Sequence, residues 1–474
     1  MQFKINPKNP SATALRVVPV FQDQIDQILK EKLGKTVPAQ ALFSGKKDTT
    51  YALTVEDQVV FLVGLGENPD YKTLENSFRK ILSKNPDLIE GEVVLDFSEA
   101  FSLEQLEAAL VGFQLGAYSI GFYKKEKAKD YSKLKTEVRS GLKKTKSVAE
   151  RAEKIAAAKI EAFKLVDLPP NKITPESLAD WAKNLGKRTG VSVKVFDTKK
   201  AKSEGLEAFL AVGRGSAKEP KFIILEYRHP KAKFHLGLVG KGVTFDTGGL
   251  NIKTQGMHHM KSDMGGAAAV LATTQLIADL ELPIHLTSIV PAVENAIDKD
   301  AYLPSEVISS HAGLSIEVID TDAEGRLILA DGLSYLIKNY KTDQVIDFAT
   351  LTGSAIGTFG YECAALFSND GGLSHGLQQA GEEIGEKSWP LPLWENYGKE
   401  MDSEIADIKN YHGKPFAGAI TAAKFLEAFT HQHKAWAHLD IAGVAFSDSE
   451  FAKTKTGTAY GVSLLLKFIE NQLQ

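Results

Sequence analysis

The sequence is poor in cysteine, in long apolar runs and in net charge, and each shortage excludes a class of protein. Cys363 is the single cysteine among 474 residues. An internal disulfide and a thiolate metal cluster within one chain are therefore excluded. No uninterrupted apolar run is long enough to span a bilayer, and the first residues lack the apolar core of a signal peptide. We expect no membrane association and a reducing, cytoplasmic setting.

The charge balance gives no overall preference for a charged partner. The formal net charge is −4, so no global field points to nucleic acid or to an anionic membrane. A lysine-rich stretch runs from Tyr123 to Lys159, but acids interrupt it, and only Tyr123 and Tyr131 offer aromatic stacking. We interpret this stretch as a solvated segment that leads into a connecting helix. Nucleic acid is not expected as a partner.

Length and composition predict a globular protein of two or three domains, because 43% of the residues are hydrophobic and 24% are charged. After residue 170, strand-type and helix-type patterns alternate. The predicted strands cover 191–196, 221–227, 234–239, 284–290, 344–349 and 436–441, and the predicted helices cover 264–280, 327–340 and 418–433. This alternation predicts an α/β fold with a mostly parallel central sheet flanked by helices. We divide the chain into a smaller N-terminal α/β domain (1–147), a connecting helix (148–170) and a larger C-terminal domain (171–474).

The stretch from Asp320 to Leu327 is the most informative part of the sequence. Asp320, Asp322 and Glu324 alternate between a strand-type run and a helical pattern. In an extended segment, side chains two apart point the same way, so these acids could offer oxygen ligands to a divalent cation. Taken alone, acids at such a junction are more often helix-capping residues. An EF-hand calcium loop is excluded because its twelfth position is Asp331, not Glu, and because a strand pattern precedes it.

A second polar segment follows the strand predicted to end at residue 239. Lys241 and Asp246 lie in a glycine-rich run, and Lys253 and Asp263 come shortly after it. Taken singly, each would be a turn residue, a helix cap or a surface charge. A nucleotide phosphate loop is excluded because Gly242, not Ser or Thr, follows the lysine. Together with the last two acids of the first motif, these residues supply four carboxylates and two lysines from loops at strand ends, where sites in such folds gather.

Four neighbouring carboxylates require strong positive charge. Like charges raise one another's pKa values, and two divalent metals about 3.5–4 Å apart commonly solve this problem in hydrolases. A lysine can bind a metal only when neutral, which requires its pKa to fall from roughly 10.4. A second, charged lysine could polarise a carbonyl or stabilise an oxyanion.

These motifs resemble those of the leucyl aminopeptidases, also called cytosol aminopeptidases. The family signature Asn-Thr-Asp-Ala-Glu-Gly-Arg-Leu appears as residues 320–327, with Asp320 in place of the first Asn. The resemblance covers about residue 165 to the C-terminus, and the N-terminal part matches in outline. Its other segments are residues 240–249, 263–267, 349–353, 406–410 and 436–443.

The resemblance implies a leucyl aminopeptidase-type metallo-exopeptidase with two divalent metal ions per subunit. Zinc is the expected metal, with manganese or magnesium as alternatives at the more exchangeable site. The implied metal ligands are Lys241, Asp246, Asp263, Asp322 and Glu324. Asp246 and Glu324 would bind both ions. The implied domain at 171–474 is thus a catalytic dimetal peptidase domain.

The resemblance also implies the remaining site residues. Lys253 would polarise the scissile carbonyl, and Arg326 would hold a bicarbonate ion that acts as general base, since arginine itself stays protonated. The implied substrate contacts are Met260, Thr350 and Gly353 around the first side chain and Leu351 on the substrate backbone. Metal-activated water would then remove N-terminal residues, leucine and other apolar ones above all, from peptides with a free N-terminus. A homohexamer is the implied assembly.

Two departures from the family pattern lead to further expectations. Asp320 adds a negative charge beside the metals, and we hypothesise a tighter or altered metal preference; equal metal dissociation constants for wild type and Asp320→Asn would contradict this. The loop from Lys253 to Asp263 is one residue shorter than the commonest family pattern and carries His258 and His259. These histidines could add metal ligands, but we place them at the rim of the site, near substrate.

Two other functions share some of the same sequence features. A dimetal phosphoester hydrolase would use the same fold and metals. A scaffold or nucleic-acid-binding relative would use the lysine run between Lys124 and Lys146. The complete set of acids and lysines argues for a peptidase that has kept its catalysis.

Overall fold

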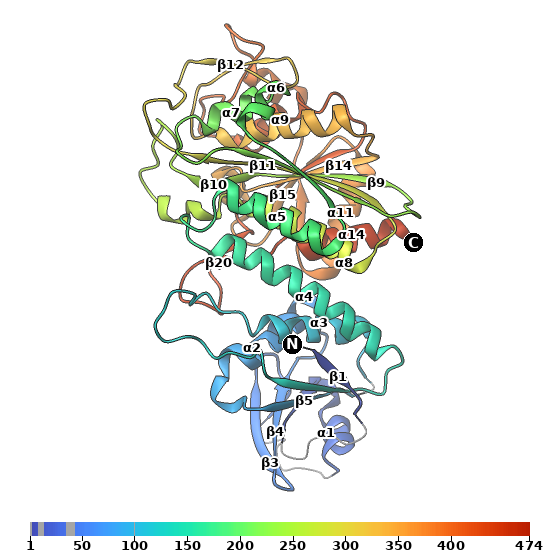
Figure 1. The fold of residues 1–474 in the computed structure, drawn as a ribbon. Coiled ribbons are helices and arrows are strands. Elements are labelled where there is room, and N and C mark those ends of the chain that lie inside the picture. The colour runs from blue at the N-terminus through green and yellow to red at the C-terminus, as the bar shows by residue number, and fades with distance from the viewer. Residues whose placement is uncertain (1, 8–13, 35–42, 99) are drawn as a thin grey trace. The chain divides into compact units, whose positions relative to one another are not determined.

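The computed structural model describes residues 2–7, 14–34, 43–98 and 100–474 and divides into two compact units (Figure 1). The N-terminal unit contains Met1–Ile160, Glu383–Gly385 and Glu450–Ala452, and the C-terminal unit contains the rest. A long helix, α4 (Thr145–Asp167), lies where the connecting helix was expected. The domain boundaries at 147 and 170 remain a prediction. Among the described helices, none combines the length and apolar character needed to cross a bilayer.

The N-terminal unit is built on a six-stranded mixed sheet of order β1-β6-β5-β2-β4-β3, in which only β3 and β4 pair antiparallel. Its strands are β1 (Phe3–Ile5), β2 (Leu15–Val20), β3 (Thr50–Val55), β4 (Gln58–Gly64), β5 (Glu92–Asp96) and β6 (Lys135–Arg139). Its helices are α1 (Ile25–Leu33), α2 (Tyr71–Lys84) and α3 (Leu103–Leu115), with 3-10 turns at Gln22–Gln24 and Pro86–Leu88. Asp70 caps α2, and a Ser102–Gln105 capping box starts α3. Helix α3 is buried over most of its length because it packs against α2.

The C-terminal unit is built on a nine-stranded sheet, most of whose pairs are parallel, as expected. Eight strands follow one another in the order β16 (Ser388–Pro390), β15 (Ala364–Ser368), β18 (Trp436–Asp440), β14 (Gln344–Ala349), β9 (His235–Gly240), β11 (His285–Asn295), β8 (Lys221–Arg228) and β7 (Ser192–Phe196). The ninth strand, β10 (Gly242–Asp246), pairs parallel with β11. Strands β18, β14, β9 and β11 form one parallel block, so their carboxyl ends share one edge.

Helices cover both faces of this sheet (Figure 1). On one face lie α5 (Pro175–Thr189), α8 (Gly265–Leu280) and α14 (Val462–Leu473), and on the other lie α7 (Glu207–Gly213) and α9 (Glu324–Asn339). Residues 265–278 of α8 are all buried, as is typical of a helix that is apolar on every side. A Thr174–Ser177 capping box and Pro175 in the first turn begin α5, as the sequence predicts.

Shorter elements complete the C-terminal unit. They are α6 (Thr198–Ser203), α10 (Gly353–Phe359), α11 (Gly371–Ile384), α12 (Glu395–Gly398), α13 (Gly418–Glu427), β12 (Val307–Ser309), β13 (Ser315–Glu317), β17 (Ile408–Lys409), β19 (Phe446–Ser447), β20 (Thr456–Gly457), and 3-10 turns at Met257–Ser262 and Lys399–Met401. The predicted helix over 418–433 ends at Glu427. It could not reach residue 433 because His431 and Gln432 adopt left-handed backbone angles. The glycine-rich run after Lys241 was expected to be a loop but forms β10, since it finds a partner in β11.

Candidate functional site

The site lies at the carboxyl edge of the parallel block. Lys241 follows β9, Thr350 follows β14, Asp246 ends β10 and Asp440 ends β18. Parallel strands bring such positions together at one edge of a sheet. The tertiary structure therefore gathers the polar residues that the sequence places after separate strands.

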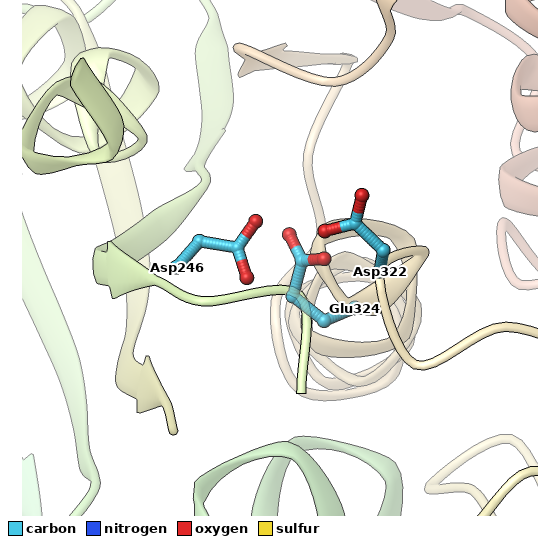
Figure 2. A group of neighbouring side chains, drawn as sticks. All are labelled: Asp246, Asp322 and Glu324. Carbon is cyan, nitrogen blue, oxygen red and sulfur yellow. The ribbon is translucent and has the colours of Figure 1, made fainter. Parts of the chain in front are cut away.

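Three carboxylates converge at this edge. Asp246, Asp322 and Glu324 each offer an oxygen within 4.8 Å of the others. Figure 2 shows the three carboxylates turned toward one another, Asp246 from the end of β10 and the other two from the turn before α9 and its first residue. Asp246 and Glu324 are almost fully buried. The positive end of the α9 dipole favours negative charge at Glu324.

Asp320 does not belong to this group, so the expected alternation of three acids along one edge is wrong for it. Residues 320–323 turn instead of extending, and α9 begins at Glu324, three residues earlier than the predicted helix. The Asp320 Oδ1 accepts a hydrogen bond of 2.8 Å from the Asp322 backbone N–H. Asp320 thus shapes the turn that presents Asp322.

Lys241 connects two of the acids. Its Nζ donates to Asp263 Oδ1 at 2.7 Å and to the Thr350 carbonyl at 2.9 Å, and it lies 3.0 Å from Glu324 Oε1. The lysine is buried. Its side chain crosses the first turn of α9 at Gly325, where an added Cβ would come within 2.5 Å of the Lys241 Cε. A glycine is therefore required at this position.

Lys253 connects Asp246 and Asp322, the two acids that Lys241 does not contact. Its Nζ lies 2.9 Å from Asp246 Oδ2 and 2.5 Å from Asp322 Oδ1. A tight turn after β10 returns the chain, and the Lys253 N–H donates to the Thr247 carbonyl at 2.9 Å. Gly248 in this turn has a φ of +85°, which a glycine adopts without strain. Both lysines thus stand between pairs of acids.

Burial and mutual repulsion set the charge states of the cluster. Burial, together with the negative charges of Glu324 and Asp246, raises the pKa of Asp322 to about 7. The same causes raise the pKa of Asp263 well above its usual range, and burial with the charge of Asp246 raises that of Glu324. Burial would lower the pKa of Lys241 and Lys253, but the surrounding carboxylates outweigh it and raise both. The site holds more negative charge than its lysines balance.

The donor set fits divalent metal ions. Asp263 Oδ2 and Glu324 Oε2 are buried and accept no hydrogen bond from any described residue. A buried carboxylate oxygen without a donor costs free energy. Bound dications would remove that cost, and carboxylate oxygens are ligands that such ions take in proteins.

Three residues that the sequence interpretation gave no role support the site. Asn295, at the end of β11, donates to Asp246 Oδ1 at 2.8 Å. Asp440 accepts the Leu351 N–H at 3.1 Å and the Thr352 hydroxyl at 2.6 Å, which holds the loop after β14. Asn410 accepts the Ile319 N–H at 2.7 Å. Asn410 and Asp440 lie in motifs that carry the family resemblance, whereas for Asn295 the only sequence signal is its place at the end of a strand.

A cavity of about 670 Å³ opens over the acids. Its lining includes all the predicted metal ligands, Lys253 and the four predicted substrate contacts, Met260, Thr350, Leu351 and Gly353. His259 lines the cavity and His258 packs on it with ring centroids 3.9 Å apart. Neither histidine joins the metal-binding group.

Arg326 is buried and is not part of the cavity lining. Its Nη1 donates to the Asn410 carbonyl at 2.8 Å, while its Nε donates to no described residue. Burial lowers the pKa of Arg326 to about 10, so the guanidinium stays charged at neutral pH. A buried cation with a free donor is suited to hold a small anion.

Comparisons with known proteins agree with this geometry. The catalytic-domain model of the cytosol aminopeptidase family matches residues 161–466, and its N-terminal-domain model matches residues 6–127. The chain is 42% identical to a probable cytosol aminopeptidase of Chlorobaculum tepidum over 433 residues, which cover 87% of this chain and 86% of that protein. It is 37% identical to the corresponding protein of a Geobacter species, with full coverage of both.

Solved structures extend the agreement to the fold. The 1.8 Å crystal structure of the cytosol aminopeptidase from Coxiella burnetii superposes with a TM-score of 0.86 at 32% identity, covering 100% of this chain and 99% of that one. The bottromycin maturation enzyme BotP in complex with Mn superposes with a TM-score of 0.87 at 30% identity, covering 98% and 100%. The chain belongs to the cytosol aminopeptidase family and is a metal-dependent exopeptidase that acts on the N-termini of peptides.

Proposed function

We propose that the carboxylate cluster holds two divalent ions. Lys241, Asp263, Asp246 and Glu324 would hold one, and Asp246, Asp322 and Glu324 would hold the other. The observation that carries this proposal is the convergence of three carboxylates within 4.8 Å beside two buried, unpaired carboxylate oxygens. Zinc is the expected metal, with Mn²⁺ or Mg²⁺ at one site. When bound, the ions supply an acidified water as nucleophile and a Lewis acid for the scissile carbonyl.

The chain's own residues would then orient the peptide. Thr350, Leu351 and Gly353 form a loop that Asp440 holds, and with Met260 they would receive the first side chain and the backbone of the substrate. Because Met260 and Leu351 line this part of the cavity, we expect it to take leucine and other apolar side chains. Because the proposed reaction requires a free α-amine on the substrate, cleavage would be restricted to true N-termini.

Lys253 and Arg326 would each stabilise a negative charge during the reaction. The Lys253 ammonium lies between Asp246 and Asp322 on the cavity wall, where it can donate to the oxygen on which negative charge develops. Arg326 would hold bicarbonate through its free Nε, and the bound anion would supply a general base.

The test of this function is metal-dependent hydrolysis of Leu-p-nitroanilide by the full chain. Activity should disappear when the metals are stripped and return when zinc or manganese is added. The N-acetylated substrate should remain uncleaved, because it lacks a free amine. Cleavage of the acetylated substrate at a similar rate, or activity indifferent to metal, would contradict the proposal.

Replacing Lys253 by methionine should lower kcat by about a hundredfold to a thousandfold, as the loss of one oxyanion donor does in other enzymes. KM should change little if the contact strengthens in the transition state. Steady-state kinetics on the metal-loaded variant checks this. Metal content, measured on the same sample, separates loss of the donor from loss of metal. A normal kcat with two bound ions would remove Lys253 from the reaction.

We further propose that the chain works in the cytoplasm as a homohexamer. The relatives that it matches are described as cytosol aminopeptidases, and the hexamer rests on family resemblance. Light scattering of the purified protein would measure the assembly directly.

A further inference from the structure

Outside the metal centre, the cavity carries one permanent charge. The acids in its lining are Asp246, Asp263, Asp322 and Glu324, all of the metal centre. In the described part of the chain, the remaining ionisable lining residues are His259, Tyr361 and Lys455. Burial and the neighbours His258, Lys455 and Lys261 lower the pKa of His259, and Asp448 opposes this shift. Among the described lining residues outside the metal centre, no acid balances the charge of Lys455.

Lys455 has a hydroxyl, not a carboxylate, as its partner. Its Nζ donates to the Tyr361 Oη at 2.9 Å and lies 4.5 Å from the centre of the Tyr361 ring. Among the described residues, no acid forms an ion pair with it, although the lysine is half-buried. The ammonium has two further N–H groups, and the tyrosine keeps its own O–H proton for donation. The pair thus presents charge-assisted donors from two side chains to one point.

Both side chains are carried by fixed backbone. Tyr361 directly follows Gly360, which caps α10. The Gly360 carbonyl packs on the loop after β18, where a Cβ at Gly443 would lie 2.2 Å from the Gly360 oxygen. Lys455 comes directly before β20, which pairs with β19. Phe446, the first residue of β19, lines the same cavity. Because the backbone is fixed, ligand binding would have to order only the side chains of these two residues.

We propose that Lys455 and Tyr361 bind a carboxylate of the peptide substrate and so make this enzyme select short or acidic peptides. A carboxylate is the group in a peptide that matches a cation and a hydroxyl donor side by side. It can come from the C-terminus of a dipeptide or from the side chain of an acidic residue near the scissile bond. The proposal rests on the proposed aminopeptidase function.

The experiment compares kcat/KM for three matched substrate pairs in the metal-loaded, full-length enzyme. Leu-Gly against Leu-Gly-amide reports the terminal carboxylate. Glu-Gly-amide against Gln-Gly-amide reports the first side chain, and Leu-Glu-amide against Leu-Gln-amide reports the second. The variant is Lys455→Met, which removes the charge and keeps most of the stem. The matched control is Lys453→Met, an exposed lysine on the same loop that does not line the cavity.

Wild type should prefer the charged member of at least one pair, and Lys455→Met should lower that preference by about fivefold to tenfold, as expected for a charge-assisted hydrogen bond. Lys453→Met should keep the wild-type preference. The pair that responds identifies the source of the carboxylate. If Lys455→Met does not fold, the wild-type preference must itself weaken as salt rises from about 0.05 to 0.5 M.

Unchanged ratios in Lys455→Met, or a wild-type preference indifferent to salt, would overturn the inference while leaving the aminopeptidase function intact. Failure of the metal-loaded wild type to cleave any of the six substrates would instead overturn the proposed function, and the inference with it.

Discussion

Replacing Glu324 by glutamine should reduce kcat by about a thousandfold or more. Glu324 is the buried first residue of α9, and its unpaired Oε2 lies in the proposed metal centre. A metal supplies several kcal/mol of transition-state stabilisation, and each 1.4 kcal/mol is tenfold in rate. The neutral amide keeps the shape but weakens the binding of both ions that the carboxylate would share. Kinetics at saturating metal, together with metal analysis, measures the effect.

A surface carboxylate provides the control for this variant. Glu204, which follows α6 and pairs with Lys200, is not part of the cavity lining, and Glu204→Gln should keep normal activity and metal content. The Glu324→Gln protein should also remain folded by circular dichroism, because Gln preserves the packing at the start of α9. Near-normal activity with two bound ions would show that Glu324 does not bind the metals.

Replacing Lys159 by methionine should destabilise the N-terminal unit by up to about 3 kcal/mol. This is less than the about 3–5 kcal/mol usual for breaking a buried ion pair, because Lys72 still pairs with Glu75. Lys159 in α4 lies 2.5 Å from Glu75 Oε2 in α2, and the two side chains are 1% and 2% exposed. Lys72 holds the other oxygen of Glu75 at 2.7 Å. Denaturant unfolding, with hydrogen exchange to follow α2, would measure the loss.

Two further variants separate charge from packing. The double variant Glu75→Leu with Lys159→Met removes both charges of this pair, so the loss should be much smaller than in the single variant. The exposed pair Lys135–Glu92 is the matched control, since its side chains are 62% and 31% exposed. Lys135→Met should cost no more than about 1 kcal/mol. Equal losses in Lys159→Met and Lys135→Met would contradict the prediction.

The same ion pair predicts a pH dependence. Burial would raise the pKa of Glu75, but Lys159 and Lys72 outweigh it and lower the pKa from 4.5 to about 2. Because the folded pKa is depressed, the stabilisation is complete above about pH 4.5 and is lost as the pH falls toward 2. In the Lys159→Met variant, the slope of unfolding free energy against pH in this window should be smaller than in wild type.

Local pattern predicted the fold well where periodicity and capping decide the structure. The β14 strand over residues 344–349 was predicted to the residue. Predictions failed where contacts with residues far away in the sequence decide the local structure. The segment after Lys241 forms a strand because it pairs with β11. The helix that begins at Gly418 ends at Glu427, before His431, whose backbone angles are left-handed.

For the site, the residue types and the nearby strand ends were visible in the sequence, and the roles came from family resemblance. Spacing alone placed Asp320 with Asp322 and Glu324, whereas the turn before α9 directs Asp320 to the Asp322 backbone. The supporting residues Asn295 and Asp440 show their role only through hydrogen bonds across the sheet.

By itself, then, the sequence determined an α/β protein with acids and lysines placed directly after strands, because hydrophobic periodicity and turn chemistry act over a few residues. Only the tertiary structure decided that Asp246 and Asp263 meet Asp322 and Glu324, and that Tyr361 and Lys455 share their cavity. The proximity of these residues depends on the order in which the strands pair. Strand order is a property of the whole sheet that no local pattern encodes.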